Sequence, residues 1–121
     1  MTPHVNETEF GYIIIEKQKY DYDIYIQLDG SVLKRKKKLS KAIYGTSHTI
    51  SIEEAKHFFE KKAELVIIGT GQYSQVTLSE EAADYFKRKK CRVYCTSTPQ
   101  AIQFWNDSDI KKRIALFHVT C

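Results

Sequence analysis

Apolar and polar residues alternate along the first third of the chain, and this alternation predicts antiparallel strands. Tyr12–Ile15 is rich in β-branched residues, and the polar Glu16–Lys19 after it favours a turn. From Tyr20 to Leu28 every second residue is apolar, as in a strand with one buried face. Asp29-Gly30 then predicts a type I′ hairpin turn, because that turn needs positive φ at both central positions. We expect the partner strand to run from Ser31 to about Lys37.

The apolar period changes in the middle of the chain. Leu39–Thr46 has no clear pattern, and we expect it to be a connection. Ser51 and Glu54 have capping-box spacing, in which the serine hydroxyl binds the amide three residues on and the glutamate returns to the serine amide. Apolar residues then recur at helical spacing between charged ones. The sequence therefore predicts a helix from Ser51 to about Ala63.

Strands and helices alternate through the rest of the chain. The expected order is strand Leu65–Ile68, helix Ser79–Lys89, strand Cys91–Cys95, helix Pro99–Asn106 and strand Ile114–Val119. Helices of this length between strands form βαβ crossovers, which join parallel strands. With 121 residues and 42% hydrophobic content, the chain suits one core of ordinary size. We expect a single α/β domain over residues 1–121, with N-terminal antiparallel hairpins followed by a βαβαβ, mostly parallel sheet.

The strand Leu65–Ile68 runs directly into Gly69-Thr70-Gly71, a pattern that begins many phosphate-binding loops. The P-loop pattern continues with a second Gly and Lys-Ser/Thr, and the dinucleotide pattern continues with a third Gly that opens a helix. Neither continuation is present, and the next expected helix begins only at Ser79. We therefore expect that no helix N-terminus abuts this loop. Two interpretations stay open: a structural turn, or a loop that binds an anion or small ligand.

Two histidines add groups that titrate near neutral pH. His48 lies in a small polar cluster that also suits an ordinary loop, and His118 lies near the end of the last expected strand. If these segments end at the same edge of the sheet as the glycine loop, they form one pocket. The candidate ligand-binding residues are His48, Gly69, Thr70, Gly71, Gln72 and His118. No catalytic set and no metal-ligand spacing is complete, so we predict no catalytic residue, metal or cofactor.

Five consecutive basic residues produce most of the net charge of +4. They are Lys34, Arg35, Lys36, Lys37 and Lys38. On a strand and the connection after it, such charge protects an exposed sheet edge from pairing with other chains. The alternative is contact with nucleic-acid phosphates, which no RNA-binding motif in the sequence supports. We prefer the solvated edge.

The cysteines and the lengths of the apolar runs indicate the cellular compartment in which the protein is expected. Cys91, Cys95 and Cys121 include no CxxC pair, and on one strand the first two would lie about 13 Å apart, too far for a disulfide. Reduced thiols are therefore expected. The longest apolar runs fall far short of the about 20 residues of a membrane-spanning helix, and the N-terminus has no signal or transit pattern. We expect a cytoplasmic protein without a membrane partner.

Six stretches occur together and in order along the chain. They are Phe10-Gly11, Asp29-Gly30-Ser31-Val32, Gly45-Thr46-Ser47-His48, VIIGTGQ from Val66, TPQAIQFWN from Thr98, and His118-Val119-Thr120-Cys121. In this set the chain resembles the adipogenesis-associated domain family, a domain of unknown function. The resemblance covers nearly the whole chain and implies a three-layer β/β/α domain. Relatives in that family include small bacterial and archaeal proteins, a protein linked to adipocyte differentiation, and a mitochondrial factor that assists assembly of respiratory complex I.

Three functional hypotheses follow. The resemblance, together with the incomplete catalytic sets, favours a non-enzymatic interaction, assembly or regulatory module with a protein partner. The alternative is a protein that binds a small anion or metabolite at the Gly69–Gln72 loop, with a hydrolase activity as one variant of it. The third is nonspecific nucleic-acid binding through Lys34–Lys38. The sequence does not specify an oligomeric state.

Overall fold

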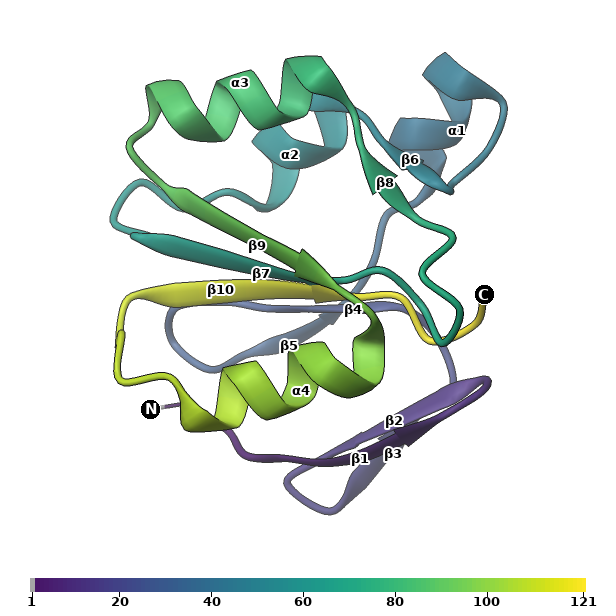
Figure 1. The fold of residues 1–121 in the computed structure, drawn as a ribbon, viewed down its shortest axis with the longest axis vertical. Coiled ribbons are helices and arrows are strands. Elements are labelled where there is room, and N and C mark those ends of the chain that lie inside the picture. The colour runs from purple at the N-terminus through teal and green to yellow at the C-terminus, as the bar shows by residue number, and fades with distance from the viewer. Residues whose placement is uncertain (1) are drawn as a thin grey trace.

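A mixed five-stranded sheet lies at the centre of the computed structural model, which describes residues 2–121 (Figure 1). Its strands, in spatial order, are β5 (Val32–Lys34), β4 (Ile24–Ile26), β10 (Arg113–Phe117), β7 (Leu65–Gly69) and β9 (Arg92–Thr96). The strands β10, β7 and β9 are parallel, whereas β4 is antiparallel to both of its neighbours. The last strand of the chain thus inserts between the hairpin β4–β5 and the strand β7.

The two faces of this sheet are covered differently. One face carries the helices α1 (Lys38–Tyr44), α2 (Ile52–Phe58) and α3 (Glu80–Arg88), beside the short parallel pair β6 (Thr49–Ile50) and β8 (Thr77–Leu78). The other face carries α4 (Thr98–Asp107) and a three-stranded antiparallel sheet of β1 (Val5–Glu9), β2 (Tyr12–Ile15) and β3 (Gln18–Tyr20). This arrangement confirms the predicted α/β class, with three layers, N-terminal hairpins and a mostly parallel sheet.

Alternating side chains of the central strands divide the core in two. In β7, Val66 and Ile68 pack with the helix layer, while Leu65 and Ile67 pack with α4 and the small sheet. All four side chains are buried, because a strand covered on both faces has no solvent side. Trp105 anchors the second core, and its indole nitrogen donates to the Pro3 carbonyl at 2.9 Å.

The predicted strand Tyr20–Leu28 is wrong in its middle. The chain bends between β3 and β4, so that Ile24, Tyr25 and Ile26 are all buried while Tyr22 is exposed. The break occurs at Asp23, whose buried carboxylate hydrogen-bonds to side chains and an amide outside the strand. A period-two pattern cannot reveal this bend, because the partners of the carboxylate lie elsewhere in the sequence.

The hairpin at Asp29-Gly30 is present, but its predicted turn type is wrong. Ile26 pairs with Val32, and only Gly30 of the two turn residues has positive φ, at 88°. Asp29 instead accepts a hydrogen bond from the Ser31 amide at 2.9 Å. Positive φ at two consecutive residues occurs at the other hairpin, at Glu16–Lys17, with values of 49° and 69°.

The helices differ from their predicted ranges in two places. Most of the expected connection Leu39–Thr46 belongs to α1, which begins at Lys38, and Gly45 ends this helix with φ of 71°. The helix after Ser51 ends at Phe58, short of Ala63, because Phe59 has extended backbone. None of the helices formed by residues 2–121 is long and apolar enough to cross a membrane.

Candidate functional site

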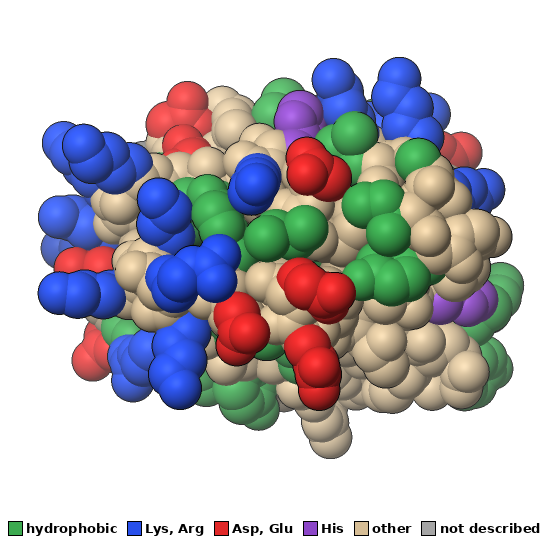
Figure 2. Space-filling model, turned by 90° about the horizontal axis from the view of Figure 1, so that it is seen from above, with side chains coloured by type: hydrophobic (Ala, Val, Ile, Leu, Met, Phe, Trp, Pro, Cys, Tyr) green, Lys and Arg blue, Asp and Glu red, His purple; other side chains and the backbone are tan. Residues whose placement is uncertain are grey.

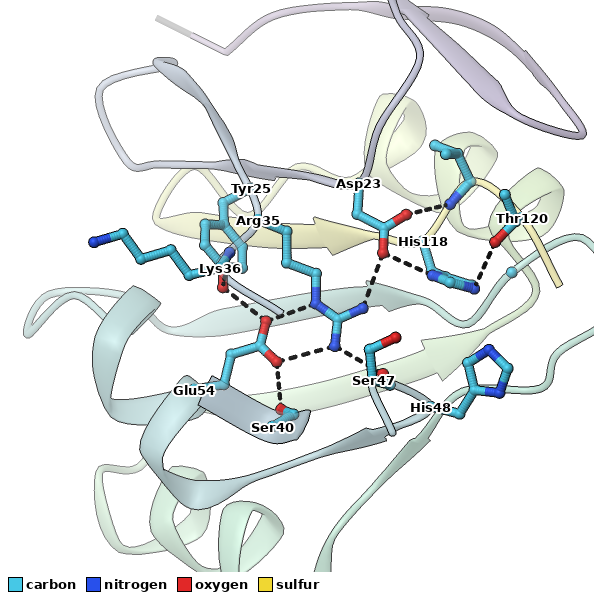
Figure 3. A network of polar contacts seen from close by, with 12 residues as sticks. Asp23, Tyr25, Arg35, Lys36, Ser40, Ser47, His48, Glu54, His118 and Thr120 are labelled. Carbon is cyan, nitrogen blue, oxygen red and sulfur yellow. Dashed lines mark hydrogen bonds and ion pairs between the residues drawn. The ribbon is translucent and has the colours of Figure 1, made fainter. Parts of the chain in front are cut away.

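Arg35 is the centre of a buried polar network, although it lies within the run of exposed lysines (Figure 3). Its Nε donates to Glu54 Oε2 at 2.7 Å, and its Nη2 donates to Glu54 Oε1 at 2.9 Å. Nη2 also donates to the Ser47 carbonyl at 2.9 Å, and Nη1 donates to Asp23 Oδ2 at 2.9 Å. The predicted place of Arg35 in a solvated edge or on nucleic acid is therefore wrong, because its guanidinium is buried and bonded within the protein.

The network favours the charged form of Arg35 and the neutral form of Tyr25. Burial alone would lower the pKa of Arg35, but hydrogen bonds and charge from Glu54 and Asp23 outweigh it and raise the pKa. Burial also raises the pKa of the Tyr25 hydroxyl, and the neighbouring Glu54 carboxylate raises it further. Tyr25 therefore stays neutral and donates to Glu54 Oε2 at 2.7 Å. Two buried carboxylates and one guanidinium are thus held together by hydrogen bonds that compensate for lost hydration.

Glu54 takes part in this network because the predicted capping box is only half formed. Ser51 Oγ accepts from the Glu54 amide at 3.1 Å, as expected. The Glu54 carboxylate does not return to the Ser51 amide, which donates instead to Ser40 Oγ at 3.0 Å. Ser40 Oγ donates to Glu54 Oε1 at 2.6 Å. Ser40 of α1 therefore takes the place of Glu54 as the acceptor for the Ser51 amide, and the Glu54 carboxylate is free to bind Arg35.

A second branch of the network runs from Asp23 to the end of the chain. Asp23 Oδ2 lies 2.7 Å from His118 Nδ1, and Oδ1 accepts from the Val119 amide at 2.9 Å. Burial alone would raise the pKa of Asp23, but His118, the Val119 amide and Arg35 together lower it to about 2. The ionised carboxylate accepts the proton of Nδ1, and the other ring nitrogen, Nε2, faces Thr120. Thr120 Oγ1 lies 3.1 Å from that Nε2.

The glycine loop packs directly against this branch. Gly71 has φ of 108°, and a side chain there would clash with the backbone of Cys121 and with the ring of His118. A side chain at Gly69 would lie 2.8 Å from Phe117 and 2.9 Å from Thr98. Both glycines are therefore needed because other parts of the chain approach their backbone closely.

The polar groups of the glycine loop form hydrogen bonds with other parts of the protein. The Thr70 amide and hydroxyl both donate to the Thr96 carbonyl, at 2.8 and 3.0 Å. The Gln72 amide donates to the Thr120 carbonyl at 2.7 Å, while its side chain donates to Thr8 at 3.1 Å. These contacts close the loop over the C-terminal segment.

The prediction that no helix N-terminus abuts the loop is wrong, because α4 begins there. The Thr98 amide donates to the Gly71 carbonyl at 3.0 Å, and the Gly71 amide donates to Thr98 Oγ1 at 2.9 Å. The loop and the start of α4 thus satisfy each other's backbone groups. The local sequence could not reveal this contact, because 27 residues separate Gly71 from Thr98.

The structure brings some of the predicted pocket residues together. The rings of His48 and His118 lie edge to face with centroids 5.6 Å apart, and the backbone of Gly71 lies so close that an added side chain would clash with the same His118 ring. His48 is half-buried, so it is the more accessible of the two histidines. The Thr70 hydroxyl and the Gln72 side chain do not join the histidines, because they bind Thr96 and Thr8. A ligand pocket at these residues stays a prediction.

Two exposed aromatic residues beside this branch were not recognised as site residues in the sequence. Phe10 and Tyr73 are 56% and 69% exposed, and their ring centroids lie 6.2 Å apart. The Gly11 amide donates to the Val119 carbonyl at 2.7 Å, and the Tyr73 amide donates to the Cys121 carbonyl at 3.1 Å. The turn of β1–β2 and the glycine loop thus flank the C-terminal segment. We call Phe10 and Tyr73 the aromatic pair.

The remaining predicted site residues lie apart from this network. Lys34, Lys36, Lys37 and Lys38 are exposed on the edge strand β5 and at the start of α1. Cys91, Cys95 and Cys121 are free thiols, and burial raises the pKa of Cys91 to about 11. Within residues 2–121, no three His, Cys, Asp or Glu side chains are grouped to hold a metal ion.

Comparison with known proteins identifies relatives over nearly the whole chain. Conserved hypothetical protein PH1505 from Pyrococcus horikoshii OT3 is 29% identical with a TM-score of 0.89, and the match covers 97% of this chain and 98% of that one. The protein MT938 is 30% identical with a TM-score of 0.84, and the match covers 99% of this chain and 100% of that one.

A more distant relative shares the fold. A protein from Bordetella pertussis, described as a Mth938-like domain, is 15% identical with a TM-score of 0.64, over 97% of this chain and 85% of that one. No curated protein matches the sequence. The family described as "Protein of unknown function (DUF498/DUF598)" matches residues 5–116. The chain therefore belongs to the DUF498/DUF598 family of proteins of unknown function.

Proposed function

We propose that this protein is a non-enzymatic cytoplasmic interaction module that binds a partner protein during assembly or regulation. The aromatic pair carries the proposal, because Phe10 and Tyr73 are the two most exposed large apolar side chains among residues 2–121. Aromatic residues contribute much of the binding energy where they become buried at protein interfaces. Two of them side by side on neighbouring loops form a compact anchor for an apolar side chain of a partner.

The backbone around the aromatic pair supports this role because it is held rigidly. Hydrogen bonds tie both loops to the C-terminal segment, through the amides of Gly11, Gln72 and Tyr73. Asp23 in turn holds that segment through the Val119 amide and the His118 ring. A surface that is already ordered loses little conformational entropy on binding. The buried network thus serves as the support of the docking surface.

The resemblance to the adipogenesis-associated domain family supports an assembly role, since one relative there is a respiratory complex I assembly factor. The three free thiols suit a reducing compartment such as the cytoplasm. The partner that fits carries an apolar or aromatic side chain able to pack on Phe10 and Tyr73, beside the acidic side chains of Glu7 and Glu9 on β1. Basic residues flanking that apolar side chain would complement the two carboxylates.

Affinity purification from native cells tests this proposal with one variant and one matched control. Phe10→Ser/Tyr73→Ser removes the aromatic pair, while Leu33→Ser/Tyr94→Ser removes two exposed apolar side chains from the two edge strands. The wild-type protein and the control are expected to recover the same partner reproducibly, and the pair variant is expected to lose it. Equal recovery by all three proteins, or no reproducible partner at all, contradicts the proposal.

The chain of hydrogen bonds from Asp23 through His118 to Thr120 favours a second function, ester or thioester hydrolysis. An ionised carboxylate that orients an imidazole, which in turn accepts from a hydroxyl, is the arrangement that activates nucleophiles. Thr120 Oγ1 would attack the substrate carbonyl, and His118 Nε2 would take the hydroxyl proton and pass it to the leaving group. Water would then attack the acyl–Thr120 ester while His118 takes a proton from it and passes that proton to Thr120 Oγ1, which releases the acid and restores the hydroxyl.

Hydrolysis of p-nitrophenyl acetate separates this second function from the first. Thr120→Ser keeps a hydroxyl beside His118, whereas Thr120→Val keeps the shape and removes it. Activity in the wild-type and Ser proteins that is lost in the Val protein supports the hydrolase. Equal rates in all three, at the level of buffer alone, exclude this ester as a substrate and leave Thr120 as a structural hydroxyl.

A further inference from the structure

Basic residues gather at the end of the central sheet where the three parallel strands begin. Nine of the 19 Lys and Arg residues lie there, all exposed: Lys61, Lys62, Lys87, Arg88, Lys89, Lys90, Arg92, Lys111 and Lys112. Figure 2 shows the blue side chains crowded at this end of the helix face. We call these nine residues the basic end. It lies opposite the edge that carries the aromatic pair.

Backbone hydrogen bonds hold the three basic segments next to one another. The Glu64 amide donates to the Lys112 carbonyl at 2.7 Å, and the Arg92 amide donates to the Glu64 carbonyl at 3.0 Å. The loop after α2, the turn after α3 and the loop before β10 thus meet at one place. A sequence scan for basic runs finds only Lys87–Lys90 of this cluster, because the other residues are spread from position 61 to position 112.

The positive charge of the basic end is not compensated by ion pairs. The three ion pairs found among residues 2–121 all belong to the buried network of Asp23, Arg35, Glu54 and His118. Glu60, a carboxylate from the same region, accepts instead from the Leu28 amide at 2.7 Å. Lys87 and Arg88 lie in the last turn of α3, where the helix dipole favours cations. The dipole accounts for these two residues but not for the other seven.

The basic end contains a groove with an aromatic wall. The groove has a volume of about 530 Å³ and is lined by Phe59, Lys61, Tyr85, Arg88, Lys89 and Lys90. A second groove of about 410 Å³ shares Lys90 and is lined further by Ala83, Lys87, Cys91, Arg92 and Val93. Cations therefore line two adjoining depressions on the surface of α3 and the start of β9.

The aromatic side chains in the first groove are firmly supported. The rings of Phe59 and Tyr85 lie 5.7 Å apart, and both pack against Phe86, which is fully buried. Lys89 Nζ lies 5.6 Å from the Tyr85 ring centroid, so a cation and an aromatic face are presented together. Both side chains also pack against the core of the helix layer, and their partly exposed rings are of the kind on which a strand of nucleotides stacks its bases.

We propose that the basic end binds single-stranded nucleic acid. The backbone phosphates lie along Lys61, Arg88, Lys89 and Lys90, and a base stacks on Tyr85 in place of the Lys89 side chain. A duplex fits less well, because its bases are already stacked on one another and cannot reach an aromatic wall. This site is separate from Lys34–Lys38 and is independent of the proposed partner surface.

Fluorescence anisotropy with a labelled single-stranded oligonucleotide of about 12 nucleotides tests the proposal. Lys61→Gln/Arg88→Gln/Lys89→Gln/Lys90→Gln removes four charges from the groove. The control Lys34→Gln/Lys36→Gln/Lys37→Gln/Lys38→Gln removes four exposed charges elsewhere, so both variants have the same net charge. We expect a loss of affinity of about tenfold or more for the first and less than about threefold for the second. Circular dichroism checks that both variants fold.

Two further measurements separate a stacking groove from a merely positive surface. The wild-type slope of log affinity against log salt is expected near −3, as for about four phosphate contacts, and the groove variant should flatten it. Tyr85→Leu should weaken single-strand binding several-fold while leaving the weaker binding of duplex unchanged. The proposal is overturned if the two four-charge variants lose affinity equally, if duplex or anionic phosphatidylserine vesicles bind more tightly than the single strand, or if no oligonucleotide binds.

Discussion

The two ends of the parallel strands use charge in opposite ways. Beyond the carboxyl ends, Asp23, Arg35 and Glu54 are buried, and their charges are compensated by one another. At the amino ends, nine basic side chains are exposed and have no ion-pair partner among residues 2–121. The buried, paired charges hold segments of the chain together, whereas the exposed basic side chains are free to contact a partner. The same residue type therefore has a structural or a binding role according to its burial.

The largest effect is expected from Glu54→Ala. This change leaves Arg35 buried without its bidentate partner, which costs about 3–5 kcal/mol in the free energy of unfolding. Glu53→Ala, an exposed neighbour on the same helix, should cost less than about 0.5 kcal/mol. Urea denaturation of both variants measures the difference. Similar small costs for the two would show that the buried network does not hold this end together.

Gly71→Ala tests the clamp of the glycine loop on the C-terminal segment. The added methyl group clashes with Cys121 and His118 at a positive φ, and the combined cost is about 3 kcal/mol. Gly45→Ala also meets a positive φ but has open space around it, so about 1 kcal/mol is expected. Denaturation midpoints compare the two. Equal costs would mean that the close approach of the C-terminal segment is unimportant.

Acid should weaken the buried network through Asp23. Its pKa is lowered from 3.8 to about 2 on folding, so the ionised carboxylate stabilises the folded state above pH 4. That contribution, about 2.5 kcal/mol at 1.36 kcal/mol per unit, is lost as the pH falls through 4 towards 2. Unfolding free energies measured from pH 5 to pH 2 should therefore fall more steeply for the wild-type protein than for Asp23→Asn. Parallel curves would contradict the assignment.

The smallest effect is expected at the basic end. Lys89→Gln and Lys90→Gln should each change the unfolding free energy by less than about 0.5 kcal/mol, because the side chains are exposed and lack ion pairs. Thermal denaturation at low and high salt checks this. A destabilisation as large as that of Glu54→Ala would remove the contrast between the two ends.

The fold was largely predictable where one local pattern determines one element. β7, α3, α4 and β10 follow from the alternation of apolar strands with helices of about ten residues, and Ser79 Oγ caps α3 by accepting from the Ala82 amide at 3.1 Å. α1 was missed because Lys38–Tyr44 has no distinct apolar stripe. β1 was missed because four of its five residues are polar, so it has no apolar pattern of its own and is ordered by pairing with β2.

The candidate site was predictable only in part. The sequence suggested that His48, Gly71 and His118 lie near one another. Gly71 and His118 do so because they follow the neighbouring parallel strands β7 and β10, whereas His48 precedes β6. Arg35 has the same local sequence environment as its lysine neighbours, so its burial depends on Asp23 and Glu54, which lie 12 and 19 residues away. The aromatic pair and the basic end form only when distant loops meet, and no single window of sequence contains either.

Site-specific photo-cross-linking in living cells tests the proposed docking surface most directly. A benzophenone amino acid placed at Tyr73 lies in the aromatic pair, and the same amino acid at Tyr94 lies on the edge strand β9 as a control. We predict one reproducible cross-linked protein from position 73 that is absent from position 94 and is lost when Phe10→Ser is added. The same products from both positions, or none from position 73, would contradict the role of this edge in binding a partner.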